Sequence, residues 1–421
     1  MTRRIARVPR SIVALALLAP LLAGCGGDGA RGDFARTFGG DPEIAGFELS
    51  TADNMPFTGG VSADVDARAG ASETELHGLV ERLSGFVREH EDVGAVITVR
   101  ADAITVPVFA ETESSSTALA AALALAADDR VATVGLAAAD GEDRITSAGL
   151  QLAEAAGVDA AFALALDAPE LLAKATEGAA PWLSVRDAET AVRIQGRPGP
   201  WLETARSTWT TVAGALETTA ISAEPERIDL TLADESDVAA ATALVDAMPS
   251  QTAIPVVFSS PLVALGLNAT GTSLRTLFAG LDPADRALVR TSWTDDAEAS
   301  MRLASIDDAG TLARALATVP AASAFELLTL TVGAADDPTL RVTSAPAELA
   351  AAVTAARAVL ADPEAASLVV SPVGVTLTTA HDASDAELEG RLDALEALAA
   401  PGARACAERP DGRSVCASPT R

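Results

Sequence analysis

The sequence predicts an α+β protein made of tandem, degenerate units, each with the element order βαββαβ. Three observations carry this prediction. Stretches of alternating apolar and polar residues are followed by amphipathic helices, the helices begin at recognisable capping residues, and some strands follow one another directly as hairpins. The hairpins disfavour a doubly wound parallel sheet, in which a helix would connect every pair of strands.

The first unit opens with a strand over residues 61–68, where apolar and polar side chains alternate. A helix follows, because Ser72 and Glu75 form a capping box ahead of an apolar stripe that runs to Val87. The remaining expected elements are two strands, a helix and a final strand, at 95–99, 104–109, 115–127 and 131–136. This order is the split-βαβ arrangement of ferredoxin-like folds.

The C-terminal third repeats the same order of elements. Pro346 opens a helix over 347–360, since proline costs little in the first turn. A second capping box, from Ser384 to Glu387, begins a helix whose leucines are three and four residues apart. Residues 373–395 thus resemble the strand, polar loop and capped helix of the first unit.

We interpret these copies as an internal repeat of about 75–85 residues. The alternative is that any chain of alternating strands and helices shows such matches. The expected organisation is a signal segment at 1–24, a flexible tether at 25–57, α/β units at 58–140, 141–220, 221–297 and 298–372, and a C-terminal β-α segment at 373–421.

The N-terminus predicts the location of the protein. A region with four arginines precedes an apolar run over 12–23 that is too short to span a bilayer but suits a signal peptide. The run ends in Leu22-Ala23-Gly24-Cys25, which resembles the lipobox of bacterial lipoproteins. The resemblance implies cleavage before Cys25 and a diacylglycerol on its thiol. It covers only the first 25 residues, and the alternative is a secretory signal with an unrelated cysteine.

Composition and charge narrow the possible partners. The chain has 59 acidic against 30 basic residues and a formal net charge of −29, which argues against nucleic acid as a partner. Such a protein is repelled by an anionic membrane surface, so the lipid on Cys25 would hold it there. Gly26–Asp33 is rich in glycine, as flexible linkers are. We therefore expect an extracytoplasmic protein anchored to the cell membrane.

Cys406 and Cys416 are expected to form a disulfide, because thiols outside the cytoplasm become oxidised. On the chain-entropy model, the small loop that they close would contribute roughly 3 kcal/mol. A metal site is disfavoured there, because no histidine and no third cysteine lies nearby.

The sequence contains no motif of a familiar catalytic site: no Gly-x-Ser-x-Gly, no His-Glu-x-x-His and no phosphate-binding loop ending in Gly-Lys-Ser/Thr. The three histidines are scattered along the chain. Pairs of acidic residues are placed where helices begin, as caps are, although those at 140–143 could hold a cation weakly. We expect no catalytic residue, no cofactor and no resident metal.

The tryptophans are the candidate ligand-binding residues. Trp201 and Trp209 fall on one expected helix, roughly 80° apart around its axis. With Trp293, they could line a groove for a sugar or a peptide. The alternative is that these rings fill the core between units.

Three hypotheses for the function follow from these features. The first is a non-catalytic interaction or scaffold module of the cell envelope, with an envelope protein as its partner. The second is a solute-binding lipoprotein, such as an importer component, with a small-molecule ligand. The third is an envelope hydrolase whose active-site residues are too dispersed to identify. We favour the first, because tether, repeats and missing motifs all agree with it.

Overall fold

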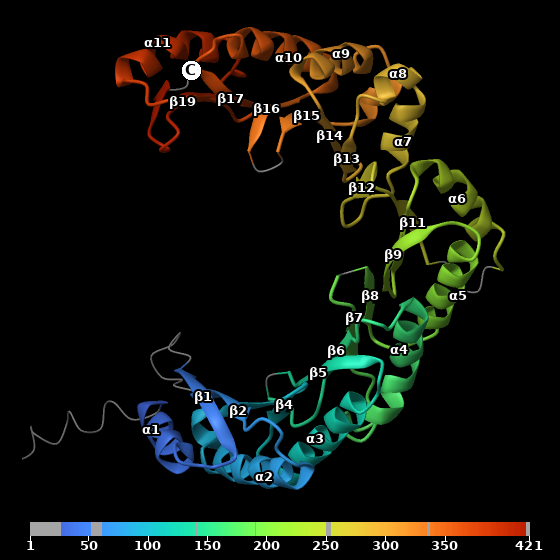
Figure 1. Cartoon of the computed structure of the whole chain (residues 1–421), viewed down its shortest axis with the longest axis vertical. Coiled ribbons are helices and arrows are strands. Elements are labelled where there is room, and N and C mark those ends of the chain that lie inside the picture. Colours follow the sequence, from blue (N-terminus) through green and yellow to red (C-terminus); the bar gives the residue numbers. More distant parts are fainter. Residues whose placement is uncertain are drawn as a thin grey trace, which may run out of the picture. The chain divides into compact units, whose positions relative to one another are not determined.

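The computed structural model describes residues 27–51, 61–139, 141–189, 191–249, 254–334 and 337–417. The expected signal segment and Cys25 lie outside these ranges. The structure contains helices and mixed sheets of strands, which confirms the α+β class. The chain divides into two compact units, which are larger than the α/β units expected from the sequence. We call them the first unit, which comes mainly from residues up to 207, and the second unit, which comes mainly from residues after 254. Figure 1 shows the elements in chain order.

The strands form two sheets, each in chain order. The first sheet contains β1 Ile44–Thr51, β2 Val61–Ala67, β3 Val96–Ala101, β4 Ile104–Val108, β5 Val131–Ala137, β6 Ser147–Leu152, β7 Trp182–Arg186, β8 Val192–Gly196, β9 Thr218–Glu224, β10 Arg227–Leu232 and β11 Val256–Ser259. The second sheet contains β12 Val263–Leu265, β13 Thr291–Thr294, β14 Glu298–Leu303, β15 Leu327–Gly333, β16 Pro338–Ser344, β17 Ala365–Ser371, β18 Gly374–Thr379, β19 Arg404–Glu408 and β20 Ser414–Ala417.

Apart from α1, which precedes β1, the helices lie in every second connection between strands, and α7 and α8 share one connection. They are α1 Gly27–Phe38, α2 Glu73–Glu89, α3 Thr112–Ala126, α4 Val158–Leu172, α5 Trp201–Ala213, α6 Val238–Asp246, α7 Thr272–Ala279, α8 Pro283–Arg286, α9 Ile306–Leu316, α10 Pro346–Leu360 and α11 Asp385–Glu396. Strands joined through a helix pair in parallel, as β2 does with β3, and strands joined by a hairpin pair antiparallel, as β3 does with β4. The crossover helix returns the chain to its starting end, so the next strand runs in the same direction.

This strand order differs from the expected ferredoxin-like one. In a split βαβ motif another strand separates the two parallel strands, whereas here β2 and β3 are direct neighbours, with Val65 opposite Val99. In the structure, strands joined through a helix are direct neighbours, and hairpins connect each such pair to the next. The expected boundaries near 140, 297 and 372 fall in hairpins, and the one at 220 falls inside β9. Periodicity within a strand carries no information on which strand pairs beside it, which is why the prediction failed.

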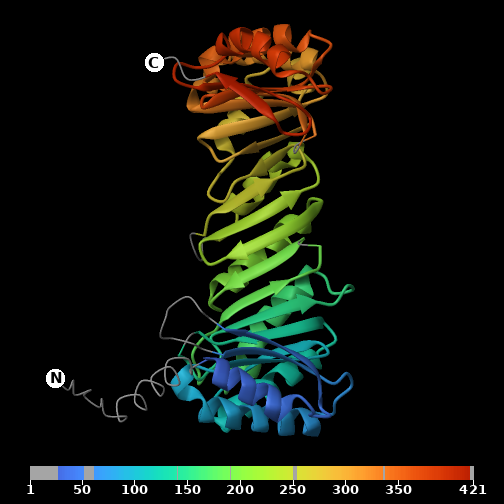
Figure 2. The same cartoon turned by 90° about the vertical axis from the view of Figure 1, so that its left-hand side faces the viewer.

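In each unit the helices cover one face of the sheet, as Figure 1 shows. Side chains on that face are buried, such as Val99 on β3, a strand that α2 contacts in the first unit, and Leu330 in the second unit. Most side chains that point to the opposite face are half-buried or exposed, with Thr331 on β15 an exception, because no described helix is in contact with that face. We call this second face of each sheet its open face; Figure 2 views strands of the first unit from that side.

Several local predictions are confirmed. Ser72 and Glu75 form a capping box at the start of α2, and Ser384 and Glu387 form one at the start of α11. Pro346 lies in the first turn of α10. These signals depend only on groups within three residues of one another, so the surrounding fold does not change them.

The segment expected to be a flexible tether is ordered where the structure describes it. It contains α1 and β1, and Phe34 on α1 is fully buried. The Phe34 ring centroid lies 5.2 Å from that of Phe47 and 5.1 Å from that of Phe86 on α2. The glycine-rich start of the segment suggested flexibility, but the phenylalanines that follow it pack α1 against the first unit. Among the described helices, none has the length and apolar content needed to cross a membrane.

Candidate functional site

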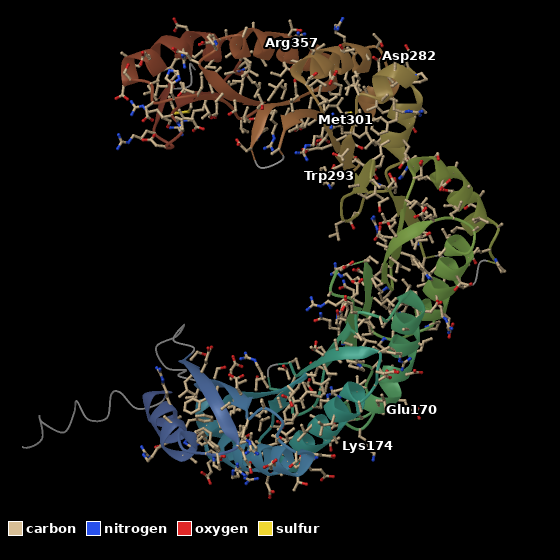
Figure 3. The ribbon with its side chains drawn as sticks, in the orientation of Figure 1. Glu170, Lys174, Asp282, Trp293, Met301 and Arg357 are labelled. Atoms are coloured by element: carbon tan, nitrogen blue, oxygen red, sulfur yellow. A yellow bond between two sulfur atoms is a disulfide. The ribbon has the colours of Figure 1, made fainter. Side chains whose placement is uncertain are left out.

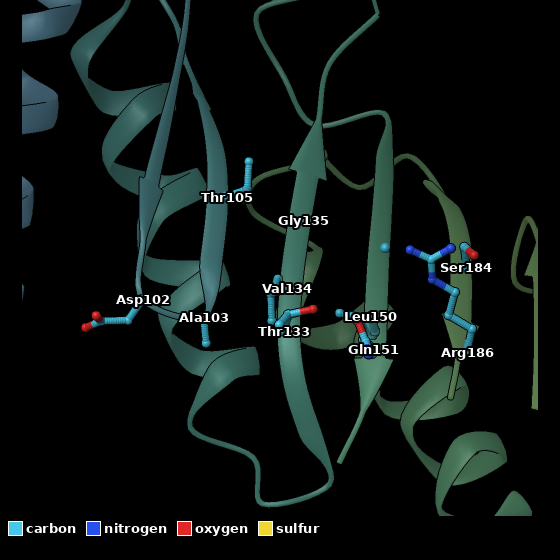
Figure 4. Close-up of a pocket in the computed structure, with 11 residues that line it drawn as sticks. Asp102, Ala103, Thr105, Thr133, Val134, Gly135, Leu150, Gln151, Ser184 and Arg186 are labelled. Carbon is cyan, nitrogen blue, oxygen red and sulfur yellow. The ribbon is translucent and has the colours of Figure 1, made fainter. Parts of the chain in front are cut away.

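A groove of about 520 Å³ lies on the open face of the first unit, across strands β4 to β7 (Figure 4). Its side chains come from alternate positions of neighbouring strands, because only every second residue of a strand points to this face. The polar residues that line it are Asp102, Thr105, Thr133, Gln151, Ser184 and Arg186.

Two glycines form the floor of the groove. Gly135 on β5 is directly opposite Gly149 on β6, and the row continues to Thr105 on β4 and to Ser184 on β7. A Cβ atom on either glycine would meet only the carbonyl oxygen of the other, at 3.8 to 3.9 Å, which is an ordinary contact. Backbone conformation therefore does not require glycine at either position. The effect of the two glycines is to leave the backbone of β5 and β6 uncovered between polar side chains.

The adjacent row of the open face carries positive charge. Gln151 pairs in register with Arg186 on β7, which in turn lies directly opposite Arg193 on β8. Both arginines are exposed. Figure 4 shows the Arg186 guanidinium group beside Ser184. Like charges directly opposite each other on antiparallel strands are destabilising.

Neither arginine has a carboxylate at ion-pair distance in the part of the chain that the structure describes. Arg193 donates from Nε to the Gln195 side-chain oxygen at 2.8 Å, and the Gln195 amide donates to Glu224. By contrast, Arg100 on the same face lies 2.9 Å from Asp64 and 3.8 Å from Asp66. The positive charge of Arg100 is therefore paired with carboxylates, whereas the charges of Arg186 and Arg193 are not.

At the other end of the groove lies Asp102, in the turn of the β3–β4 hairpin. Its φ of 45° is in the left-handed region, which aspartate tolerates better than most residues. Its carboxylate is exposed. The groove thus has a negative end at Asp102 and a positive end at Arg186, with uncharged hydrogen-bonding groups between them.

The open face of the second unit has a different character. Thr329 and Thr343 share a hydrogen bond of 2.8 Å across β15 and β16. Trp293 is 40% exposed, and its ring lies over Gly266, where a Cβ would be 3.2 Å from the ring. The disulfide between Cys406 and Cys416 joins residues that are opposite in register on β19 and β20, which confirms the expected bond.

The tryptophans predicted to bind a ligand do not line the groove. Trp201 is only 8% exposed, and its indole N–H donates to the Arg197 carbonyl at 2.7 Å, so it is a core residue with its polar atom satisfied. Trp209 is half-buried on the same helix. Trp293 lies on the open face of the second unit (Figure 3). The sequence analysis missed the glycine floor: Gly135 interrupts the alternation of the strand expected at 131–136, whereas no strand was expected around Gly149.

The described acidic pairs act mainly in local structure. Asp296 accepts hydrogen bonds from the backbone N–H groups of Thr270 and Gly271 at the start of α7. Hydrogen bonds from Arg130 lower the pKa of the Asp128 carboxyl below its usual value. Within the described ranges, no group of three or more His, Cys, Asp or Glu residues is arranged to hold a metal. The possible cation site at 140–143 includes Asp140, which lies outside the described residues.

No protein-family model, no curated protein and no solved structure matches the chain.

Proposed function

We propose that this protein is an extracytoplasmic lipoprotein that acts as a non-catalytic interaction module of the cell envelope. It engages an envelope protein through the open face of the first unit. The glycine floor formed by Gly135 and Gly149 is the observation that carries this proposal, because it gives a partner close access to backbone and side-chain hydrogen-bonding groups together.

The chemistry of the groove supports binding by many weak contacts. Thr105, Thr133, Gln151 and Ser184 surround the floor, and each can donate and accept hydrogen bonds. Protein interfaces typically carry about one hydrogen bond per 100–200 Å². Polar groups at regular spacing along neighbouring strands allow a partner to make several such hydrogen bonds at once.

The repeated arrangement of elements supports the interaction role as well. We propose that the chain consists of degenerate copies of one strand–helix–strand element, with starts such as Val61, Ile104 and Ser147. Stacked copies that are covered by helices on one side only leave a sheet face free along each unit. Repeat proteins commonly use such extended surfaces for binding.

The anchor would bring the first unit close to the membrane. One residue, Gly26, separates Cys25 from the start of α1, and α1 packs on the first unit through Phe34. A lipid on Cys25 would therefore leave little free chain between the membrane and the folded protein.

The anchor is tested by replacing Cys25 with serine in the source host. We expect loss of metabolic lipid labelling and release of the protein from the membrane fraction, because the thiol is the acceptor of the lipid. Replacing Cys416 with serine is the control and should leave labelling intact. A Cys25→Ser protein that stays in the membrane fraction contradicts the lipoprotein assignment.

The interaction role is tested by site-specific photo-cross-linking in intact cells. A photoreactive residue at Thr133, on the open face, should form a discrete protein adduct. The same residue at Glu170, exposed on α4 on the helix side, is the matched control (Figure 3). In a Gly149→Val background the Thr133 adduct should weaken, because the valine side chain fills the floor. Absence of an adduct from Thr133 in the otherwise native protein contradicts the proposal.

A solute-binding role is the second candidate. The groove volume of about 520 Å³ lies within the range of small-molecule sites. Comparing the mass of the purified protein under native and denaturing conditions distinguishes the two roles. Extra native mass of a few hundred daltons, lost in the Gly149→Val variant, would favour solute binding over protein binding.

A further inference from the structure

We infer that Arg186 and Arg193 form a binding site for carboxylate side chains on an acidic segment of the partner protein. This inference rests on the proposed function, since it specifies the chemistry of the partner at the same face.

The first argument is the placement of the two arginines. They are directly opposite each other on β7 and β8, where two positive charges repel, and both are exposed. A carboxylate placed between or above them removes this repulsion. Each guanidinium can also bind a carboxylate through two parallel hydrogen bonds.

The second argument is the contrast with the rest of the protein. Acidic residues outnumber basic ones by 59 to 30 along the chain. Arg100, on the same face, is paired with Asp64 and Asp66. Yet no described carboxylate lies at ion-pair distance from Arg186 or Arg193. The pair is therefore a local cationic patch that an acidic partner complements, while the surplus negative charge elsewhere repels that partner.

The third argument concerns the length of the site. Arg193, Arg186, Gln151 and Thr133 form one row across β8, β7, β6 and β5. Three spacings between neighbouring strands amount to about 14 Å. An extended peptide covers this distance with about four residues. A segment that crosses the sheet can therefore place carboxylates on the arginines while its backbone passes over the glycine floor.

The test uses the full-length protein in detergent and a fluorescein-labelled polyglutamate peptide, with polyglutamine of equal length as the uncharged control. Binding is followed by fluorescence anisotropy at about 0.15 M salt, where the Debye length of about 8 Å screens distant repulsion. We expect polyglutamate to bind and polyglutamine not to bind.

The arginine variants decide the assignment. Arg186→Ala with Arg193→Ala should weaken polyglutamate binding by about 10- to 100-fold, as loss of charge-assisted hydrogen bonds does. Arg88→Ala on α2 is the matched control, because Arg88 is also exposed and has no ion-pair partner in the described ranges, and it should bind as the native protein does. Arg186→Lys keeps the charge but loses the paired geometry, so its affinity should be intermediate. Unchanged thermal unfolding of each variant shows that it is folded.

Equal affinity of the double arginine variant and the native protein overturns the inference. The inference is also overturned if polyglutamate does not bind while citrate binds in a way that depends on both arginines. A small polycarboxylate would then be the ligand. The cross-link from Thr133 separates the two proposals: an adduct that persists in the double arginine variant keeps the interaction role and overturns the carboxylate site, whereas no adduct in the native protein overturns the interaction role itself.

Discussion

At the scale of single residues, the open face of the first unit contains glycines that the backbone does not need. Neither Gly135 nor Gly149 has a positive φ, and a Cβ fits at both positions. Glycine inside a strand costs roughly 0.5–1 kcal/mol relative to alanine, because it loses more conformational freedom on folding. Glycine at these two positions therefore lowers the stability of the fold and leaves the backbone of β5 and β6 uncovered.

Gly149→Val should raise the free energy of unfolding by about 0.5–1 kcal/mol, because a β-branched residue suits a strand and enters open space. Denaturant unfolding of the native protein and the variant measures this difference. Gly333→Val, in β15, is a control that should destabilise, because its φ of 96° disfavours a side chain and an added Cβ would lie 2.8 Å from the Thr339 backbone nitrogen. A destabilised Gly149→Val protein would contradict the description of the floor as free space.

A second residue-scale prediction concerns acid stability. Arg130 donates to Asp128 at 2.6 to 2.9 Å and lies 3.0 Å from Asp167 on α4, and its hydrogen bonds lower the Asp128 pKa. A carboxyl whose pKa is lower when folded stabilises the protein at pH values above its unfolded pKa of about 3.9. This contribution is lost as the pH falls through the folded pKa.

Asp128→Asn should therefore lower the unfolding temperature at neutral pH. Below about pH 4, the unfolding temperatures of the variant and the native protein should become more similar. Thermal unfolding across this pH range measures the effect. Asp129→Asn is the matched control, because Asp129 is exposed and forms no described ion pair. A difference that stays constant as the pH falls would show that the pair does not act through its charge.

At the scale of elements, helix α1 depends on aromatic packing. Phe34 is fully buried and lies between Phe47 on β1 and Phe86 on α2, with rings at 78° and 88° to its own. The described part of α1 otherwise presents mostly exposed side chains. Phe34 and the buried Phe38, whose ring centroids are 4.7 Å apart, therefore hold this helix on the first unit, with Phe34 at the centre of the cluster.

Phe34→Ala should cost about 3–5 kcal/mol locally, as deletion of a buried aromatic ring does. Since α1 is the first described element, we expect it to detach while the rest of the unit stays folded. Hydrogen exchange should speed up in residues 27–38 and stay slow in α3. Arg31→Ala, an exposed change on the same helix, is the control. Protection of α1 that survives in the Phe34→Ala protein would contradict this account.

The two capping boxes show how much of each element the sequence predicts. Ser72 with Glu75 and Ser384 with Glu387 were identified from spacing alone, and both are present. The extent of α1 was not predicted, because its stability comes from Phe86, which is distant in the sequence. The ferredoxin-like arrangement is not confirmed for the same reason: β2 pairs with β3 through contacts between residues separated by a whole helix, and the sequence left the order of strands undetermined.

At the scale of the whole molecule, the disulfide limits unfolding from the C-terminal end of the second sheet. Cys406 and Cys416 join the last two strands, and their Cα atoms are 4.0 Å apart. Reduction should destabilise β20 by up to about 3 kcal/mol, because it frees a closed loop in the unfolded state. Hydrogen exchange before and after reduction should show faster exchange in β20 with β14 and β15 unchanged. Equal exchange in both states would contradict a stabilising role.

The sequence by itself determined the α+β class, the starts of α2, α10 and α11, and the disulfide, because periodicity, capping and the pairing of two nearby cysteines depend on neighbours along the chain. It also predicts a lipid anchor at Cys25, which lies outside the described residues. Only the tertiary structure decided that strands follow one another in chain order, that Gly135 faces Gly149, and that Arg186 faces Arg193. The register between strands depends on contacts between distant residues, and no local pattern specifies which side chains will share a face with which.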